Sequence, residues 1–119
     1  MPRPTIAFSG DALSRERIET QLATGSSLVF EDCDLSGLDL SRLDLQDSVF
    51  RSCLLAETSF YAAKLARTRW QRCRGAHADF ESAELVDARY ESSDLNNSSW
   101  RRARLASAIF RGCKLTGAQ

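Results

Sequence analysis

The sequence of 119 residues lacks the features that mark several protein classes. Its basic and acidic residues, 16 of each, cancel, so no global field steers a nucleic acid or a membrane toward the chain. No apolar run approaches the ~18 residues that a membrane span needs, and the first residues lack the apolar core of a signal peptide. A composition of 43% hydrophobic and 27% charged residues is typical of a folded chain. We therefore expect one cytoplasmic domain.

A repeat of five residues runs from Phe30 to the end of the chain. Every fifth position from 30 to 115 holds Leu, Phe, Trp or Tyr, with Gly75 as the single departure. The positions two residues earlier hold only small residues after Leu43. No charged residue falls in either column, as expected for columns that point into a core. Because five matches the period of neither a helix nor a strand, the chain must bend in each unit.

Units such as 33–37 (CDLSG), 83–87 (AELVD) and 93–97 (SDLNN) resemble those of the pentapeptide repeat family. The resemblance covers residues 26–119. It implies an all-β solenoid, a right-handed quadrilateral parallel β-helix in which four units make one square coil, here about 4.5 coils. It also implies that the large and small columns lie inside. The resemblance is specific for the fold and says little about function.

A second period, of 20 residues, supports a coil of four units. Aromatic residues and leucines alternate around each coil, so rings can stack along the axis. At Gly75 either the neighbouring Trp70 fills the missing volume or a small void remains, and we favour such compensation over a ligand cavity. The expected structural core comprises Phe30, Phe50, Trp70, Tyr90 and Phe110, with Phe60, Phe80 and Trp100 opposite them and Leu45, Leu65, Leu85 and Leu105 between.

Residues 1–25 do not follow the five-residue register and are expected to cap the solenoid. Residues 5–8 have the composition of a short strand, and Ser14 and Gly25 favour the two ends of a helix near residues 14–24. Larger residues in the small column of the first coil offer a surface for this helix. The expected organisation is a strand and helix cap over residues 1–25 and a β-helix over 26–119.

The C-terminal end of the repeat leads to two alternatives. The register continues to the last residue, which predicts an open coil with exposed apolar rings. Either two molecules stack there as an end-to-end homodimer, or the natural protein continues beyond this sequence.

Residues with reactive side chains give no catalytic or metal site. Cys33, Cys53, Cys73 and Cys113 share one inward column without the close pairs of zinc sites, so they are expected to be inert. His77 lies in an outward column, where no nucleophile accompanies it. We expect no cofactor, no metal and no enzymatic activity.

Surface charges form rows of alternating sign along the 20-residue period, which predicts pairs between successive coils. Two groups of charged residues are not accounted for by such pairs. Arg69 and Arg89 are adjacent like charges and indicate a binding surface for an acidic partner. The predicted basic patch comprises Arg67, Arg69, Arg72, Arg74 and Arg89, and the predicted acidic surface of the first coil comprises Glu31, Asp32, Asp34, Asp39, Asp44 and Asp47.

The favoured interpretation is a non-enzymatic protein–protein interaction or scaffold module with an unknown partner. The family resemblance supplies an alternative, because some members resemble B-form DNA, bind DNA gyrase or topoisomerase IV and protect it from quinolones. Zero net charge and a basic surplus beyond residue 50 argue against DNA mimicry here. Direct nucleic-acid binding is weaker still, since Tyr61 is the one aromatic residue in an outward column.

Overall fold

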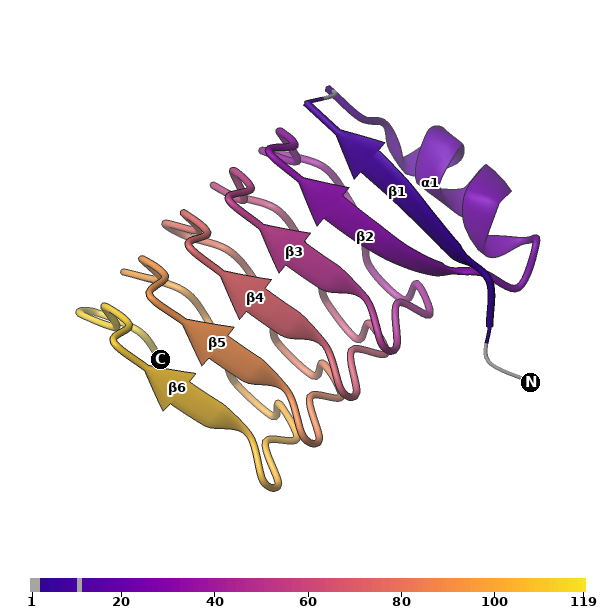
Figure 1. Ribbon diagram of the computed structural model, residues 1–119. Helices are drawn as coiled ribbons and strands as arrows, with labels where there is room; N and C mark the ends of the chain where they lie inside the picture. Colours follow the sequence, from indigo (N-terminus) through magenta and orange to yellow (C-terminus); the bar gives the residue numbers. More distant parts are fainter. Residues whose placement is uncertain (1–2, 11) are drawn as a thin grey trace.

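A computed structural model of the chain describes residues 3–10 and 12–119. It forms an all-parallel β-solenoid of about five turns, which confirms the predicted β-helix. Figure 1 shows the strands stepping along the solenoid, with the helix at the N-terminal end. The elements are β1 (Thr5–Ser9), α1 (Arg15–Leu22), β2 (Ser27–Glu31), β3 (Val49–Arg51), β4 (Arg69–Gln71), β5 (Arg89–Glu91) and β6 (Ile109–Arg111).

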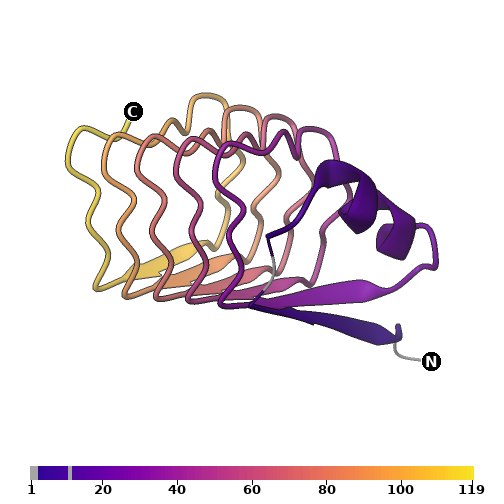
Figure 2. The ribbon, with the colours of Figure 1, turned by 90° about the horizontal axis from the view of Figure 1, so that it is seen from above.

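Each coil of the repeat spans 20 residues and has four sides. On the side that contains β2 to β6, strands pair in parallel with residues 20 apart opposite each other, such as Phe50 and Trp70. The other three sides are held by isolated parallel bridges with the same offset, for example between Asp44 and Lys64. Figure 2 shows these coils side by side, following one another along the axis of the solenoid. Outward residues one coil apart are therefore neighbours ~4.8 Å apart.

The chain turns between sides at corner residues with positive φ. Residues as different as Asp47, Arg67 and Ala62 adopt φ values of 65°, 59° and 54° there. This left-handed conformation is unfavourable for residues with a side chain. The corner N–H groups offset part of that cost by bonding to the next coil, as when Asp47 donates to the Ala66 carbonyl at 3.0 Å.

Aromatic rings stack along the axis as expected from the 20-residue period. The ring centroids of Phe50 and Trp70 lie 3.9 Å apart with an interplanar angle of 6°. Rings on opposite sides meet edge to face, as Phe60 and Trp70 do at 5.2 Å and 90°. The residues of the expected core that are fully buried are Phe30, Phe50, Trp70, Tyr90, Phe60, Phe80, Leu45, Leu65 and Leu85.

Three residues of the expected core lie differently because they belong to the last coil. Leu105 is 36% exposed, and Trp100 and Phe110 are only partly buried. Their positions in the repeat are inward. No described residue stacks on the C-terminal side of that coil, however, and so the apolar side chains remain accessible there.

The space beside Gly75 is narrow, and leucine and alanine side chains lie nearest to it. A Cβ atom added to Gly75 would lie 3.1 Å from Leu95 Cδ2 and 3.5 Å from the Cβ atoms of Leu55 and Ala78. The nearest atoms therefore come from the two neighbouring coils and from the next repeat unit, and Trp70, which stacks between Phe50 and Tyr90, is not among them.

The N-terminal strand and helix are both present. β1 extends the sheet by pairing with β2, and the Phe8 ring stacks on Phe30 with 5.4 Å between centroids. The Ser14 hydroxyl caps α1 by accepting a hydrogen bond from the Arg17 N–H. Ile18 on α1 is fully buried in the same apolar cluster as the first coil. None of the helices in the described residues is long and apolar enough to span a bilayer.

Candidate functional site

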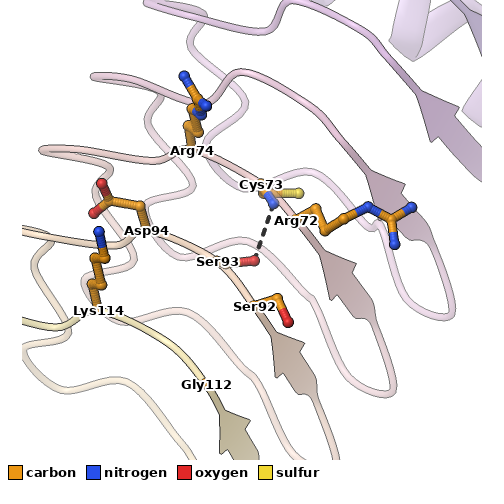
Figure 3. Close-up of a pocket in the computed structure, with 8 residues that line it drawn as sticks. All are labelled: Arg72, Cys73, Arg74, Ser92, Ser93, Asp94, Gly112 and Lys114. Carbon is orange, nitrogen blue, oxygen red and sulfur yellow. Dashed lines mark hydrogen bonds between the residues drawn. The ribbon is translucent and has the colours of Figure 1, made fainter.

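The five arginines of the predicted basic patch line two different hollows, on either side of β4 and β5. The first, the Arg89 hollow, has a volume of about 530 Å³ and contains Arg67, Arg69 and Arg89 together with Asp47, Asp87, Ser107 and Ile109. The second, the Arg72 hollow, has a volume of about 370 Å³ and is drawn in Figure 3. It is lined by Arg72, Cys73, Arg74, Ser92, Ser93, Asp94, Gly112 and Lys114.

Arg69 and Arg89 are the adjacent like charges of the Arg89 hollow. They face each other across β4 and β5 as register partners, and both are exposed. Among the described residues, neither guanidinium has a hydrogen bond or an ion pair to another side chain. Their backbones lie ~4.8 Å apart, and like charges directly opposite each other on neighbouring strands are destabilising, so an anion bound between them would be favourable.

This pair differs from all other charged neighbours along the repeat region. Wherever charged residues stand one coil apart in the same column, their signs are otherwise opposite. Such alternation neutralises the surface row by row. The opposite pairs are Glu31–Arg51, Asp44–Lys64, Lys64–Glu84, Glu84–Arg104, Asp47–Arg67, Arg67–Asp87, Arg74–Asp94, Asp94–Lys114, Glu81–Arg101 and Glu91–Arg111.

Arg67 is engaged in one of these cross-coil pairs. Its Nε and one terminal nitrogen donate to the two carboxylate oxygens of Asp47 at 2.7 and 3.2 Å. The same terminal nitrogen donates to Gln46 Oε1 at 3.3 Å. Hydrogen bonding by Arg67 lowers the pKa of Asp47. Arg67 is thus held by its neighbours, which leaves Arg69 and Arg89 as the unpaired guanidinium groups of the hollow.

The Arg72 hollow contains polar groups that satisfy one another. Figure 3 shows Arg72 and Arg74 pointing in different directions, and Ser93 accepting a hydrogen bond from the Cys73 N–H at 3.1 Å. The Ser93 hydroxyl also donates to the Glu91 carbonyl, and the Cys73 thiol donates to the Phe50 carbonyl at 3.3 Å. Ser93 therefore takes the place of a thiol in the cysteine column, and these hydrogen bonds join the Ser93 hydroxyl and the Cys73 thiol to backbone groups.

The cysteine column is structural. Cys33, Cys53 and Cys73 are buried, and each thiol donates to a carbonyl of the preceding coil. The adjacent Cys73 thiol and burial raise the pKa of Cys53, which disfavours the reactive thiolate. His77 lies at an exposed corner. The described residues contain no cluster of three His, Cys, Asp or Glu side chains suited to a metal ion.

Most carboxylates of the predicted acidic surface bond within the protein. Asp34, Asp39 and Asp44 each accept a hydrogen bond from the backbone N–H two residues later, at 2.9 to 3.2 Å. Bonds from Ser36 and Ser41 lower the pKa values of Asp34 and Asp39. These carboxylates therefore stabilise turns, and a smaller part of the acidic surface is left for a partner.

Two arginines from the N-terminal segment also contact residues of the first coil, and the sequence did not predict these contacts. Arg15 donates to the Asp39 and Ser41 carbonyls at 2.9 and 3.0 Å and lies 3.5 Å from the Asp39 carboxylate. Arg3 lies 3.9 Å from Asp47. Neither belongs to the repeat, so no period in the sequence aligns it with its partner.

The repeat, its square coil and the inward columns agree with the comparison to known families. A family model described as "Pentapeptide repeat region" matches residues 26–81 and 43–119. The chain belongs to the pentapeptide repeat family. None of the curated proteins matches it in sequence.

Solved structures with similar coils include other pentapeptide repeat proteins. HetL from the cyanobacterium Nostoc sp. strain PCC 7120, involved in heterocyst differentiation regulation, is 20% identical, with a TM-score of 0.43 over 78% of this chain and 51% of HetL. Rfr23 from Cyanothece 51142 is 15% identical, with a TM-score of 0.46 over 98% and 84%. QnrB1, a plasmid-mediated fluoroquinolone resistance protein, is 25% identical, with a TM-score of 0.42 over 94% and 58%. The chain thus spans about half the length of HetL.

Proposed function

We propose that this pentapeptide repeat protein is a non-enzymatic interaction module that binds an acidic protein partner through Arg69 and Arg89. The single observation that carries the proposal is the like-charge pair in the Arg89 hollow. Two adjacent like charges oppose stability, on a surface where charges otherwise alternate in sign. Such a locally unfavourable arrangement is expected at a binding site. A negative partner would remove the repulsion and gain charge-assisted hydrogen bonds from both guanidinium groups.

The surroundings of the pair favour a partner over a substrate. The solenoid interior is filled by stacked rings and leucines, so an enclosed reaction chamber is absent from the described residues. The outward column that holds Arg69 and Arg89 also holds Val49 and Ile109, at the two flanking strands. An apolar residue on each side of the charged pair is suited to a protein surface with an acidic centre and apolar flanks.

A binding measurement with a defined acidic probe tests the proposal. A fluorescently labelled polyglutamate peptide is titrated with the protein at low ionic strength and followed by anisotropy. Arg69→Glu with Arg89→Glu should abolish binding, because it reverses both charges at the site. The matched control is Arg72→Glu with Arg102→Glu, which makes the same change in net charge at exposed positions outside the Arg89 hollow. Equal loss in both double variants would contradict a specific site.

The alternative function is DNA-mimic binding to DNA gyrase or topoisomerase IV, with protection from quinolones. It is supported by the apolar C-terminal coil, where Leu105, Leu115 and Trp100 would be covered in an end-to-end homodimer. It is opposed by the turn hydrogen bonds and ion pairs that engage the acidic surface. Gyrase supercoiling with a quinolone, measured with and without the protein after sizing by light scattering, separates the two. Drug protection by a dimer would favour the alternative, and no effect would favour the interaction module.

A further inference from the structure

We infer that Arg69 and Arg89 form a clamp for one compact dianion, a phosphorylated side chain of the partner. The inference rests on the proposed function and specifies the group that is recognised. The two guanidinium groups stand one coil apart, at ~4.8 Å between backbones, and both are exposed and unpaired among the described residues. A phosphate monoester carries a charge close to −2 and three acceptor oxygens, so a single group can bond to both arginines and neutralise them.

The neighbouring residues limit the anion to a compact one. The charged column contains only these two arginines, because Val49 precedes them and Ile109 follows them. Asp47 and Asp87 line the same hollow on the side of the corner. A rigid polyanion, such as a nucleic-acid duplex, would hold further negative charges against these carboxylates, whereas a flexible acidic peptide can direct its other side chains away from them. A single dianion placed between the arginines avoids that repulsion.

The shape of the site also suits a projecting group. The Arg89 hollow has a volume of about 530 Å³, which is sufficient for a phosphorylated side chain and part of its backbone. Ser107 at its border offers a hydroxyl donor to a phosphate oxygen. Arg67 is already held by Asp47, so it fixes that wall of the hollow and does not compete for the ligand.

The test follows the Hε–Nε signals of the arginines by NMR while inorganic phosphate is added at constant ionic strength. We expect saturable shifts of Arg69 and Arg89, and a loss of affinity of about tenfold or more in Arg69→Gln and in Arg89→Gln, because each removes charge-assisted hydrogen bonds. Arg102→Gln, at an exposed corner that does not line the Arg89 hollow, should bind phosphate as the parent does. The backbone spectrum of each variant reports whether its fold is intact.

A second arm identifies the source of the phosphate. A phosphoserine peptide with neutral flanking residues is compared with the same peptide containing serine or glutamate. The phosphorylated peptide should bind about tenfold more tightly than either of the others, because only it presents a dianion. Arg69→Lys with Arg89→Lys should weaken it, since lysine keeps the charge and loses the planar fork of donors.

Two results would overturn the inference. One is the absence of saturable shifts at Arg69 and Arg89, or an affinity for phosphate that the glutamine variants leave unchanged. The other is a phosphoserine peptide that binds no better than the glutamate peptide. If polyglutamate still binds through the two arginines while phosphate does not, this inference fails and the proposed function stands. If neither probe binds, both fail.

Discussion

The two ends of the solenoid carry the same kind of repeat and yet differ in what covers them. At the N-terminal end, β1 and α1 lie against the first coil, and Leu45 of that coil is fully buried. At the C-terminal end, Leu105 occupies the same row and is 36% exposed. The repeat pattern decides which side chains point inward, whereas burial also requires a neighbouring layer on both sides. Capping is therefore a separate property that each end must supply.

The largest loss of stability is expected when the N-terminal end is uncovered, so that it resembles the open C-terminal end. Deletion of residues 1–25 would expose Leu28, Phe30 and Leu43 of the first coil, which are buried in the complete chain. Exposure of large apolar side chains costs about 1.5 to 3 kcal/mol each, so three of them approach the total stability of a small domain. We expect aggregation or a loss of cooperative unfolding, as measured by light scattering and circular dichroism. A truncated protein with the parent's melting temperature would show that residues 1–25 are not a cap.

A matched pair of core substitutions sharpens the comparison between interior and end. Leu65→Ala should destabilise the protein by about 2 to 5 kcal/mol, because it leaves a cavity in a closed core. Leu105→Ala should cost clearly less, since part of that side chain already contacts solvent. Both are measured by denaturant unfolding over a range of protein concentrations. Equal costs would mean that a second molecule covers Leu105 in solution.

Two equivalent hydrogen bonds, one in the interior and one in the last coil, should also differ in their contribution to stability, by a smaller amount. The Trp70 indole donates to the Thr68 hydroxyl at 2.8 Å in the interior, and Trp100 donates to Ser98 at 2.7 Å in the last coil. Thr68→Val leaves a buried indole N–H without an acceptor and should cost about 1 to 3 kcal/mol. Ser98→Ala should cost less, because Trp100 is partly accessible to water. The opposite order in denaturant unfolding would contradict the difference between the ends.

The smallest effect concerns pH and the N-terminal end. Asp34, Asp39 and Asp47 have lowered pKa values in the folded protein, from an ordinary value of 3.8. The unfolded chain therefore binds more protons as the pH falls below about 4, and the stability that these carboxylates contribute above that pH is lost. Hydrogen exchange at decreasing pH should show protection falling first in the first coil. Asp47→Asn should reduce this pH dependence, and an unchanged profile would contradict the assignment.

The core of the repeat could be predicted from the sequence because charges are excluded from two columns. The N-terminal coil could not be aligned with it. Phe8 pairs with Phe30 at an offset of 22 residues, whereas Phe30 pairs with Phe50 at an offset of 20. Helix α1 lies in that coil, between β1 and β2. The coil is two residues longer than the others, so β1 does not follow the five-residue register.

The corners and the proposed binding surface were harder to predict. Corner residues such as Arg67, Ala62 and Glu57 are not of the glycine, asparagine or aspartate types that favour positive φ, since the coil as a whole imposes the turn. The 20-residue period correctly predicted that Arg69 and Arg89 are neighbours. It grouped Arg72 with them because it lies close in sequence, although the corner after β4 directs it to another hollow.

The thermal unfolding midpoint of Arg89→Glu at low ionic strength shows whether Arg69 and Arg89 are adjacent at a cost in stability. We propose that they are, because the pair serves binding. Reversal of one charge converts repulsion into attraction and continues the alternation found elsewhere, so the midpoint should rise above that of the parent, by the equivalent of about 1 kcal/mol. An unchanged or lower midpoint would contradict the claim, because the pair would then carry no strain for a partner to relieve.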